Sequence, residues 1–302
     1  SGMPDMIGYM AKTDEAYQAE RDKEEQIYRM RSALISAGAR CLFGSKNGAL
    51  SDCHKIIEWV HRAVEEDAFK PLGFKKWPMS PDDIPLEDDS SFQFVYALAF
   101  DMTNAYAIAT KGIPTSSQSK TAFIGWMDKR LNLYRGLWER RKKEWDLRGI
   151  ENAFIAQGNA HLALYAFSGD AEKFWPELSQ WKVTLASMRP DGSLPGETRR
   201  GARALYYEAR ALQGLIKLAK MAEVQGIDLY ALPIDGGKSF EKAMAFYLTA
   251  LGNHDLIIGY AKENIGGGYA NDPIWANYRE QHLRSLIKQE TGFLDYLSVR
   301  LA

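Results

Sequence analysis

The sequence lacks the features that mark membrane proteins, nucleic-acid-binding proteins and disulfide-rich domains. No apolar run reaches about 18 residues, so we expect no membrane span. The formal net charge is −1, which gives no overall basic field, so we expect no nucleic-acid partner. The two cysteines, Cys41 and Cys53, make no zinc pattern, and they fit either one disulfide or two buried thiols. An anionic partner would have to be met by local clusters of cationic side chains.

Histidine is scarce too, with five in 302 residues. Four of them, His54, His61, His254 and His282, show no ligand spacing such as His-x-x-x-His, so we expect neither a metal nor another cofactor. No secretory signal stands at the start, and the opening "SGM" resembles a cloning scar, so residues 1–2 are set aside from the fold.

What the sequence contains throughout is helical periodicity. Within residues 14–38, apolar side chains from Ile27 to Ala37 recur at spacings of three and four, which places them on one face of a helix that Thr13 can cap. Residues 50–69 repeat the pattern, and a proline-rich loop without periodicity follows. Further helices are expected over residues 90–110, 116–146, 149–168, 170–187, 198–224, 237–252 and 273–298.

Glycine and proline separate these segments, and no strand hairpin or mid-chain linker stands out. We therefore expect residues 1–302 to form a single all-α domain. Helical hairpins in series suit an incomplete (α/α) toroid of antiparallel helix pairs, with a groove lined by helix termini and loops across one end. A helical-repeat solenoid is the alternative, although no fixed-period motif supports it. We expect a monomer.

The stretch "RRGARALYYEAR", residues 199–210, places several arginines and two tyrosines on one expected helix. With Thr198 as its N-cap, this helix has a buried apolar stripe and, roughly opposite, a second stripe of cations and a phenol. Small residues around the second stripe let a ligand approach, and few acids lie nearby. The pattern leaves two interpretations, a solvated basic face or an anion-binding site that transfers protons. The buried stripe comprises Leu205, Ala209, Leu212, Ile216 and Ala219, and the second comprises Arg200, Arg203, Tyr207 and Arg210.

The longer stretch "DGSLPGETRRGARALYYEARAL", residues 191–212, resembles the signature of the alginate lyase family, polysaccharide lyase family 5. Weaker resemblance covers most of the chain. The resemblance implies an incomplete α/α toroid and a periplasmic or secreted enzyme that cleaves an acidic polysaccharide by β-elimination. Mannuronate-rich alginate or another acidic exopolysaccharide is the substrate it implies. The matching positions are Asp191, Gly192, Leu194, Pro195, Glu197, Arg200, Arg203, Ala204, Leu205, Tyr207, Ala211 and Leu212.

The chemistry of this reaction explains the matching residue types. Removal of the C5 proton of a uronate requires that its carboxylate be neutralised or hydrogen-bonded, which stabilises the enolate-like intermediate. A base then takes the C5 proton, and an acid protonates the departing O4. The resemblance gives Arg200 the carboxylate-binding role and Tyr207 the catalytic role. Neighbouring guanidinium groups, such as those of Arg200 and Arg203, favour the phenolate form of a tyrosine.

The stretch "QGNAHLALY", residues 157–165, resembles the family motif that contains the catalytic histidine. His161 matches that histidine, and Asn159 matches the first asparagine of the motif. Ala160 replaces the second asparagine, which in the family helps to neutralise the carboxylate, so Asn159 or Gln157 is the candidate for the missing amide. This departure is compatible with a different uronic polymer, or with a degenerate protein that binds polysaccharide without cleaving it.

Two outlying segments also resemble parts of the family. The N-terminal "GYMAKTDEAY" resembles a lid segment, with Lys12 as its candidate basic residue. The stretch "IWANYREQH" resembles the last helix that faces the groove, with Trp275, Tyr278 and Arg279 as a candidate sugar subsite.

A glycoside hydrolase on the same toroid is the alternative enzyme class. It requires two carboxylates about 5–10 Å apart that flank the glycosidic bond. Asp191, Glu197 and Glu208 are available near the signature, with Asp191 expected in a turn and the two glutamates three turns apart on one helix.

Overall fold

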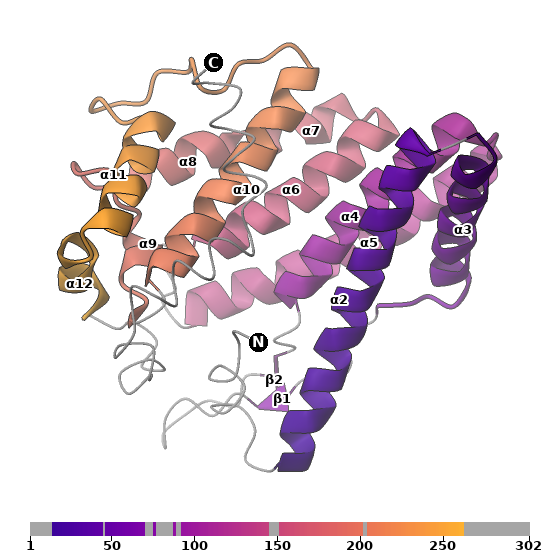
Figure 1. The fold of residues 1–302 in the computed structure, drawn as a ribbon, viewed down its shortest axis with the longest axis horizontal. Helices are drawn as coiled ribbons and strands as arrows, with labels where there is room; N and C mark the ends of the chain where they lie inside the picture. The colour runs from indigo at the N-terminus through magenta and orange to yellow at the C-terminus, as the bar shows by residue number, and fades with distance from the viewer. Residues whose placement is uncertain are drawn as a thin grey trace. The chain divides into compact units, whose positions relative to one another are not determined.

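The computed structural model describes residues 14–44, 46–69, 75–76, 87–88, 92–144, 151–201 and 204–262 (Figure 1). The chain divides into two compact units, and each is described by itself. Unit 1 comprises Ser1–Tyr9, Asp146–Gly158 and Leu178–Ala302, and unit 2 comprises Met10–Trp145 and Asn159–Glu177. The single domain expected over residues 1–302 stays a prediction.

Unit 2 is built on three long helices that pack against one another. Helix α2 contacts α3 and α4, and α3 contacts α4 and α5. The helices pair because their apolar stripes are fully buried, as at Leu34 of α2 and Ile56 of α3. An ion pair of 2.7 Å between Arg31 and Asp101 also joins α2 to α4. The elements are α2 (Asp14–Phe43), α3 (Lys46–Glu65), β1 (Lys75–Lys76), β2 (Glu87–Asp88), α4 (Phe92–Gly112), α5 (Ser117–Glu144), the later part of α6 (Glu151–Ser168) and α7 (Ala171–Glu177).

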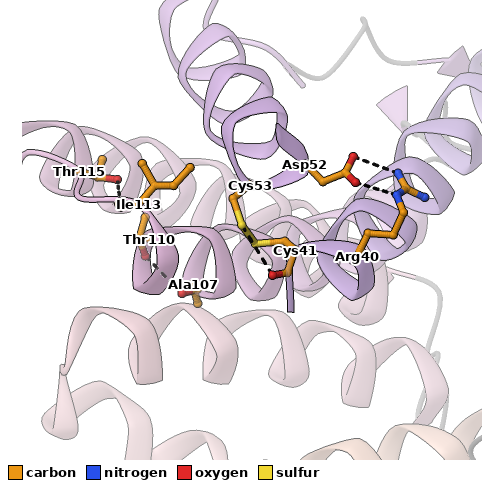
Figure 2. The surroundings of a disulfide bond; sticks show 8 residues. All are labelled: Arg40, Cys41, Asp52, Cys53, Ala107, Thr110, Ile113 and Thr115. Atoms are coloured by element: carbon orange, nitrogen blue, oxygen red, sulfur yellow. Dashed lines mark hydrogen bonds and ion pairs between the residues drawn. A yellow bond between two sulfur atoms is a disulfide. The ribbon is translucent and has the colours of Figure 1, made fainter. Parts of the chain in front are cut away.

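A disulfide between Cys41 and Cys53 connects the end of α2 to α3, so the structure selects the first of the two states that the sequence allows (Figure 2). An ion pair lies beside it, where Arg40 Nε contacts Asp52 Oδ2 at 2.8 Å. The hydrogen bond from Arg40 lowers the pKa of Asp52 below its usual value. A covalent bond and a charged pair thus hold the same helical corner.

Helix α10 is the central helix of unit 1 and contacts α9, α11 and α12. A close approach joins α6 to α8, because a Cβ on Gly158 would collide with the buried amide of Gln180. Trp181 of α8 stacks on Phe240 of α11 with ring centroids 5.5 Å apart. The elements are the first turns of α6, α8 (Ser179–Ser187), α9 (Pro195–Thr198), α10 (Ala204–Val224), α11 (Phe240–Gly252) and α12 (Asp255–Ala261).

Several expected boundaries are wrong. The helix expected over residues 170–187 is two helices, because Pro176 removes a backbone donor and obstructs the preceding turn, and the break falls at Leu178. Strands β1 and β2 form a short antiparallel pair within the segment expected to be a plain loop. Helix α12 was not expected, and the helix expected over residues 273–298 lies outside the described residues.

Among the described residues, none of the helices combines the length and the apolar character needed to cross a bilayer.

Candidate active site

The signature segment of unit 1 begins with a tight turn before α9. The backbone N–H of Arg189 donates to the Ser193 carbonyl at 2.9 Å. Asp191 Oδ1 accepts from the backbone N–H and the hydroxyl of Ser193, at 3.0 and 2.7 Å, which is the turn that short acidic side chains favour. Gly192 has φ +100°, and a Cβ there would collide with the Lys242 carbonyl of α11. Glycine is therefore required where the turn meets α11.

The helix that follows starts later than expected. Thr198 is the last residue of α9 and not the N-cap of α10, because its hydroxyl donates to the Leu194 carbonyl at 2.8 Å and accepts from Arg189 Nη1 at 2.7 Å. Gly201, before α10 starts at Ala204, has a φ of +57°, a conformation that glycine adopts readily. Arg200 consequently lies in the connection between the two helices.

The structure nevertheless brings Arg200 and Tyr207 together. The guanidinium carbon of Arg200 lies 4.0 Å from the centroid of the Tyr207 ring. Tyr207 is 4% exposed and Arg200 is half-buried, so water is partly excluded from the contact, which strengthens a cation–π interaction. Beside it, Arg210 Nη1 donates to the Tyr206 hydroxyl at 3.3 Å. Two neighbouring tyrosines of α10 thus each contact an arginine, and only the contact between Arg200 and Tyr207 involves both candidate catalytic residues of unit 1.

Two fully buried glutamates support this turn. Glu197 Oε1 accepts from the backbone N–H and from Nδ2 of Asn152, each at 2.6 Å. Glu208 Oε1 accepts from the backbone N–H of Leu194 at 3.2 Å. The expectation that the two glutamates share one helix is wrong, because Glu197 belongs to α9. Burial raises the pKa of Glu197 to about 6, while attraction to Arg200 acts in the opposite direction.

The motif that resembles the family's histidine segment lies on α6, where unit 2 begins again at Asn159. His161 is fully buried, and Asn159 is 4% exposed. Because His161 and Asn159 are two residues apart on a helix, their side chains project from different faces of α6. Gln157, the other candidate amide, is 2% exposed, and Ala160 is fully buried.

Sequence reasoning missed Tyr165, which lies one turn after His161 on the same face of α6. The two ring centroids are 5.7 Å apart. The Tyr165 hydroxyl donates to Asp128 Oδ1 at 3.4 Å. Burial and then the Asp128 carboxylate strongly raise the pKa of Tyr165, which therefore stays a neutral hydrogen-bond donor. The spacing of four residues from His161 was the signal that could have identified it.

Some expected site residues cannot be placed. Lys12, Arg203, Trp275, Tyr278 and Arg279 lie outside the described residues, so their roles stay predictions. Within the described ranges, no three His, Cys, Asp or Glu side chains gather where they could hold a metal ion.

Comparison with known proteins identifies relatives of this chain. A family model described as alginate lyase matches residues 94–257, which is more than half of the chain. A curated polysaccharide lyase of Stenotrophomonas maltophilia is 26% identical over 115 residues, covering 38% of this chain and 33% of its own length.

Solved structures show the same fold. The crystal structure of alginate lyase A1-III from Sphingomonas species A1 aligns with TM-score 0.61 at 20% identity, over 79% of this chain and 62% of its own. A variant of that enzyme complexed with a tetrasaccharide aligns with TM-score 0.61 at 21% identity, over 78% of this chain and 61% of its own. An alginate lyase from Bacteroides ovatus aligns with TM-score 0.60 at 16% identity, over 85% of this chain and 64% of its own. The likeness confirms the predicted fold class, an all-α incomplete (α/α) toroid.

The chain is shorter than these relatives. It spans about a third of the length of the curated polysaccharide lyase and somewhat less than two thirds of the length of the solved enzymes.

Proposed function

Because the chain belongs to the alginate lyase family, we propose that it is a polysaccharide lyase that cleaves a uronic acid polymer by β-elimination. The substrate is mannuronate-rich alginate or another acidic exopolysaccharide. The observation that carries the proposal is the contact between Arg200 and the buried ring of Tyr207, which joins a group that can bind an anion to a group that can transfer a proton. The names of the relatives, alginate lyases among them, support the same reaction class.

In the proposed reaction, Arg200 binds the carboxylate of the uronate and stabilises the charge that develops on it. The C5–H bond breaks and its proton passes to a base, the electron pair forms the C4–C5 double bond, and the C4–O4 bond breaks. The departing O4 receives a proton. Tyr207 and His161 share these proton transfers, and Asn159 or Gln157 provides the amide on the carboxylate.

More distant contacts complete the proposal. Arg203 and Lys12 add positive charge for the polymer, and Trp275, Tyr278 and Arg279 form a sugar subsite. The protein acts alone, as a monomer in the periplasm or as a secreted enzyme. The Cys41–Cys53 disulfide supports this location, since disulfides persist in oxidising compartments.

The test is direct. Purified protein is incubated with mannuronate-rich, guluronate-rich and glucuronate polymers and with bacterial exopolysaccharides, while ultraviolet absorbance follows the new double bond. We expect one of these polymers to give the absorbing product, and its carboxyl-reduced form to give none. Cleavage that leaves no double bond would indicate a hydrolase.

The replacement of the family asparagine by Ala160 favours one other function, a degenerate lyase that binds polysaccharide. Binding to an acidic polymer without any cleavage in the same assay would identify that protein.

A further inference from the structure

Glu197 is a buried carboxylate in the turn that presents Arg200. Its side chain is fully buried, and burial opposes its charged form although Arg200, Asn152 and Arg210 favour that form. A charge in such a place costs free energy unless it is paired and hydrogen-bonded. A neutral amide would fill nearly the same volume, so the carboxylate calls for a role that depends on its charge.

The carboxylate first of all holds the start of α6. Both bonds from Asn152 to Glu197 Oε1 are 2.6 Å long, and one comes from the backbone. Backbone N–H groups in the first turn of a helix have no partner within that helix, and the helix dipole favours a negative charge there. Glu197 thus caps α6 from another part of unit 1.

Glu197 also shapes the turn that follows it. Its carbonyl accepts a hydrogen bond from the backbone N–H of Arg200 at 3.2 Å. At the other end of α9, the backbone N–H of Leu194 is bound by the buried carboxylate of Glu208. Both ends of this four-residue helix are therefore fixed, and its exit leads directly to the guanidinium that covers Tyr207.

We propose that Glu197 is a positioning residue: its carboxylate, bound to Asn152 at the start of α6, holds the α9 turn and the guanidinium of Arg200 over Tyr207. The consequence for catalysis rests on the proposed lyase function. The geometric part does not, because the contact between Arg200 and Tyr207 can be observed without substrate. We assign no proton transfer to Glu197.

Nuclear magnetic resonance of protein with carbon-13 in its tyrosine side chains gives that observation. The Tyr207 resonance is assigned by its loss in Tyr207→Phe, and Arg200→Ala gives its position without the guanidinium. We expect Glu197→Gln, which removes the negative charge that attracts Arg200 and weakens the bonds from Asn152, to shift the resonance toward that position. Glu223→Gln, an exposed change on α10, should leave it unmoved. The proposal would be overturned if the Tyr207 resonance stayed at its wild-type position in Glu197→Gln. It would also be overturned if Arg200→Ala did not shift that resonance.

Steady-state kinetics on mannuronate-rich alginate, or on whichever polymer the wild type cleaves, measures the catalytic consequence. We expect Glu197→Gln to lower kcat about 10-fold to 100-fold, the scale for misplacing a group by about 1 Å, with a smaller change in KM. A purely structural role would reduce the folded fraction and leave kcat per folded molecule unchanged, which would also overturn the proposal. A wild type that cleaves no uronic polymer would contradict the proposed function, and the Tyr207 resonance would still decide the role of Glu197.

Discussion

The guanidinium of Arg200 lies 4.0 Å from the centre of the Tyr207 ring, although the two residues belong to different local structures. Arg200 lies in the connection after α9, whereas Tyr207 lies in the first turn of α10. The contact brings a cation that can bind a carboxylate against a phenol that can transfer a proton.

The hydroxyl of Tyr207 is the first part of this pair to test. Tyr207→Phe keeps the ring under Arg200 and removes only the group that transfers a proton. We expect the rate of double-bond formation to fall at least ~10²-fold, the usual scale for lost acid–base catalysis, with the melting temperature nearly unchanged. Tyr206→Phe is the matched control, because it removes the neighbouring hydroxyl. Turnover of Tyr207→Phe near the wild-type rate would exclude this role.

Arg200→Lys tests the planar cation. Lysine keeps the charge but cannot bind a carboxylate in bidentate fashion or stack flat on the ring. We expect kcat/KM on the native polymer to fall ~10²-fold, as for the loss of one donor to a developing oxyanion. Salt should weaken polymer binding by the wild type, since the attraction is electrostatic. A kcat/KM for Arg200→Lys equal to that of the wild type would show that the guanidinium does not bind the uronate.

The sequence predicted part of this arrangement, although it assumed one continuous helix that the structure does not show. The buried stripe of α10 follows from helical spacing alone, and all five of its members are at most 5% exposed. The spacing of seven from Arg200 to Tyr207 also suggested a contact, but on the assumption of one continuous helix. Thr198 was expected to be an N-cap because threonine is a favoured N-cap residue. Its hydrogen-bond partner Arg189 lies nine residues away in the sequence, so no local pattern could reveal that contact.

Other features of the site depend on tertiary packing, which local sequence patterns do not show. The sequence offered Glu197 and Glu208 only as available carboxylates near the signature, whereas the structure shows both to be fully buried. Their partners, Asn152 and Leu194, become neighbours only when α6, α9 and α10 pack together. In the same way, the sequence left the state of Cys41 and Cys53 open until α2 was placed beside α3.

The disulfide should contribute measurably to stability. Cys41 and Cys53 are the two cysteines of the chain and close a loop of 12 residues in sequence separation. A cross-link of that span lowers the entropy of the unfolded chain, so reduction should cost about 3 kcal/mol of unfolding free energy. Denaturant titration with and without a thiol reductant measures it, and Cys41→Ser/Cys53→Ser should no longer respond to the reductant. Identical midpoints for the oxidised and reduced wild type would contradict the prediction.

Glu197 should make stability depend on pH. Because its pKa rises from an ordinary 4.5 to about 6 on folding, the folded protein favours the protonated carboxyl more than the unfolded chain does. The contribution of Glu197 to stability is therefore complete below pH 4.5 and is lost as the pH rises through 6. Glu197→Gln cannot titrate, so its unfolding free energy relative to the wild type should rise over the same interval. A relative stability of Glu197→Gln that falls with pH would contradict the raised pKa of Glu197.

The last prediction concerns Ala160, where the family has its second asparagine. Ala160 is fully buried in the middle of α6, so the larger polar side chain of Ala160→Asn should lower the unfolding free energy by about 1–3 kcal/mol. We expect activity on the native polymer to fall as well, because Asn159 or Gln157 already provides the amide in the proposed reaction. Either Asn159→Ala or Gln157→Ala should then lower kcat ~10²-fold, the scale for one oxyanion donor, and the variant that does so identifies the amide. Higher activity of Ala160→Asn on mannuronate-rich alginate would show instead that the wild type lacks this amide. An active wild type that tolerates Ala160→Asn, Asn159→Ala and His161→Ala alike would remove α6 from the site and leave Arg200 and Tyr207 as its core.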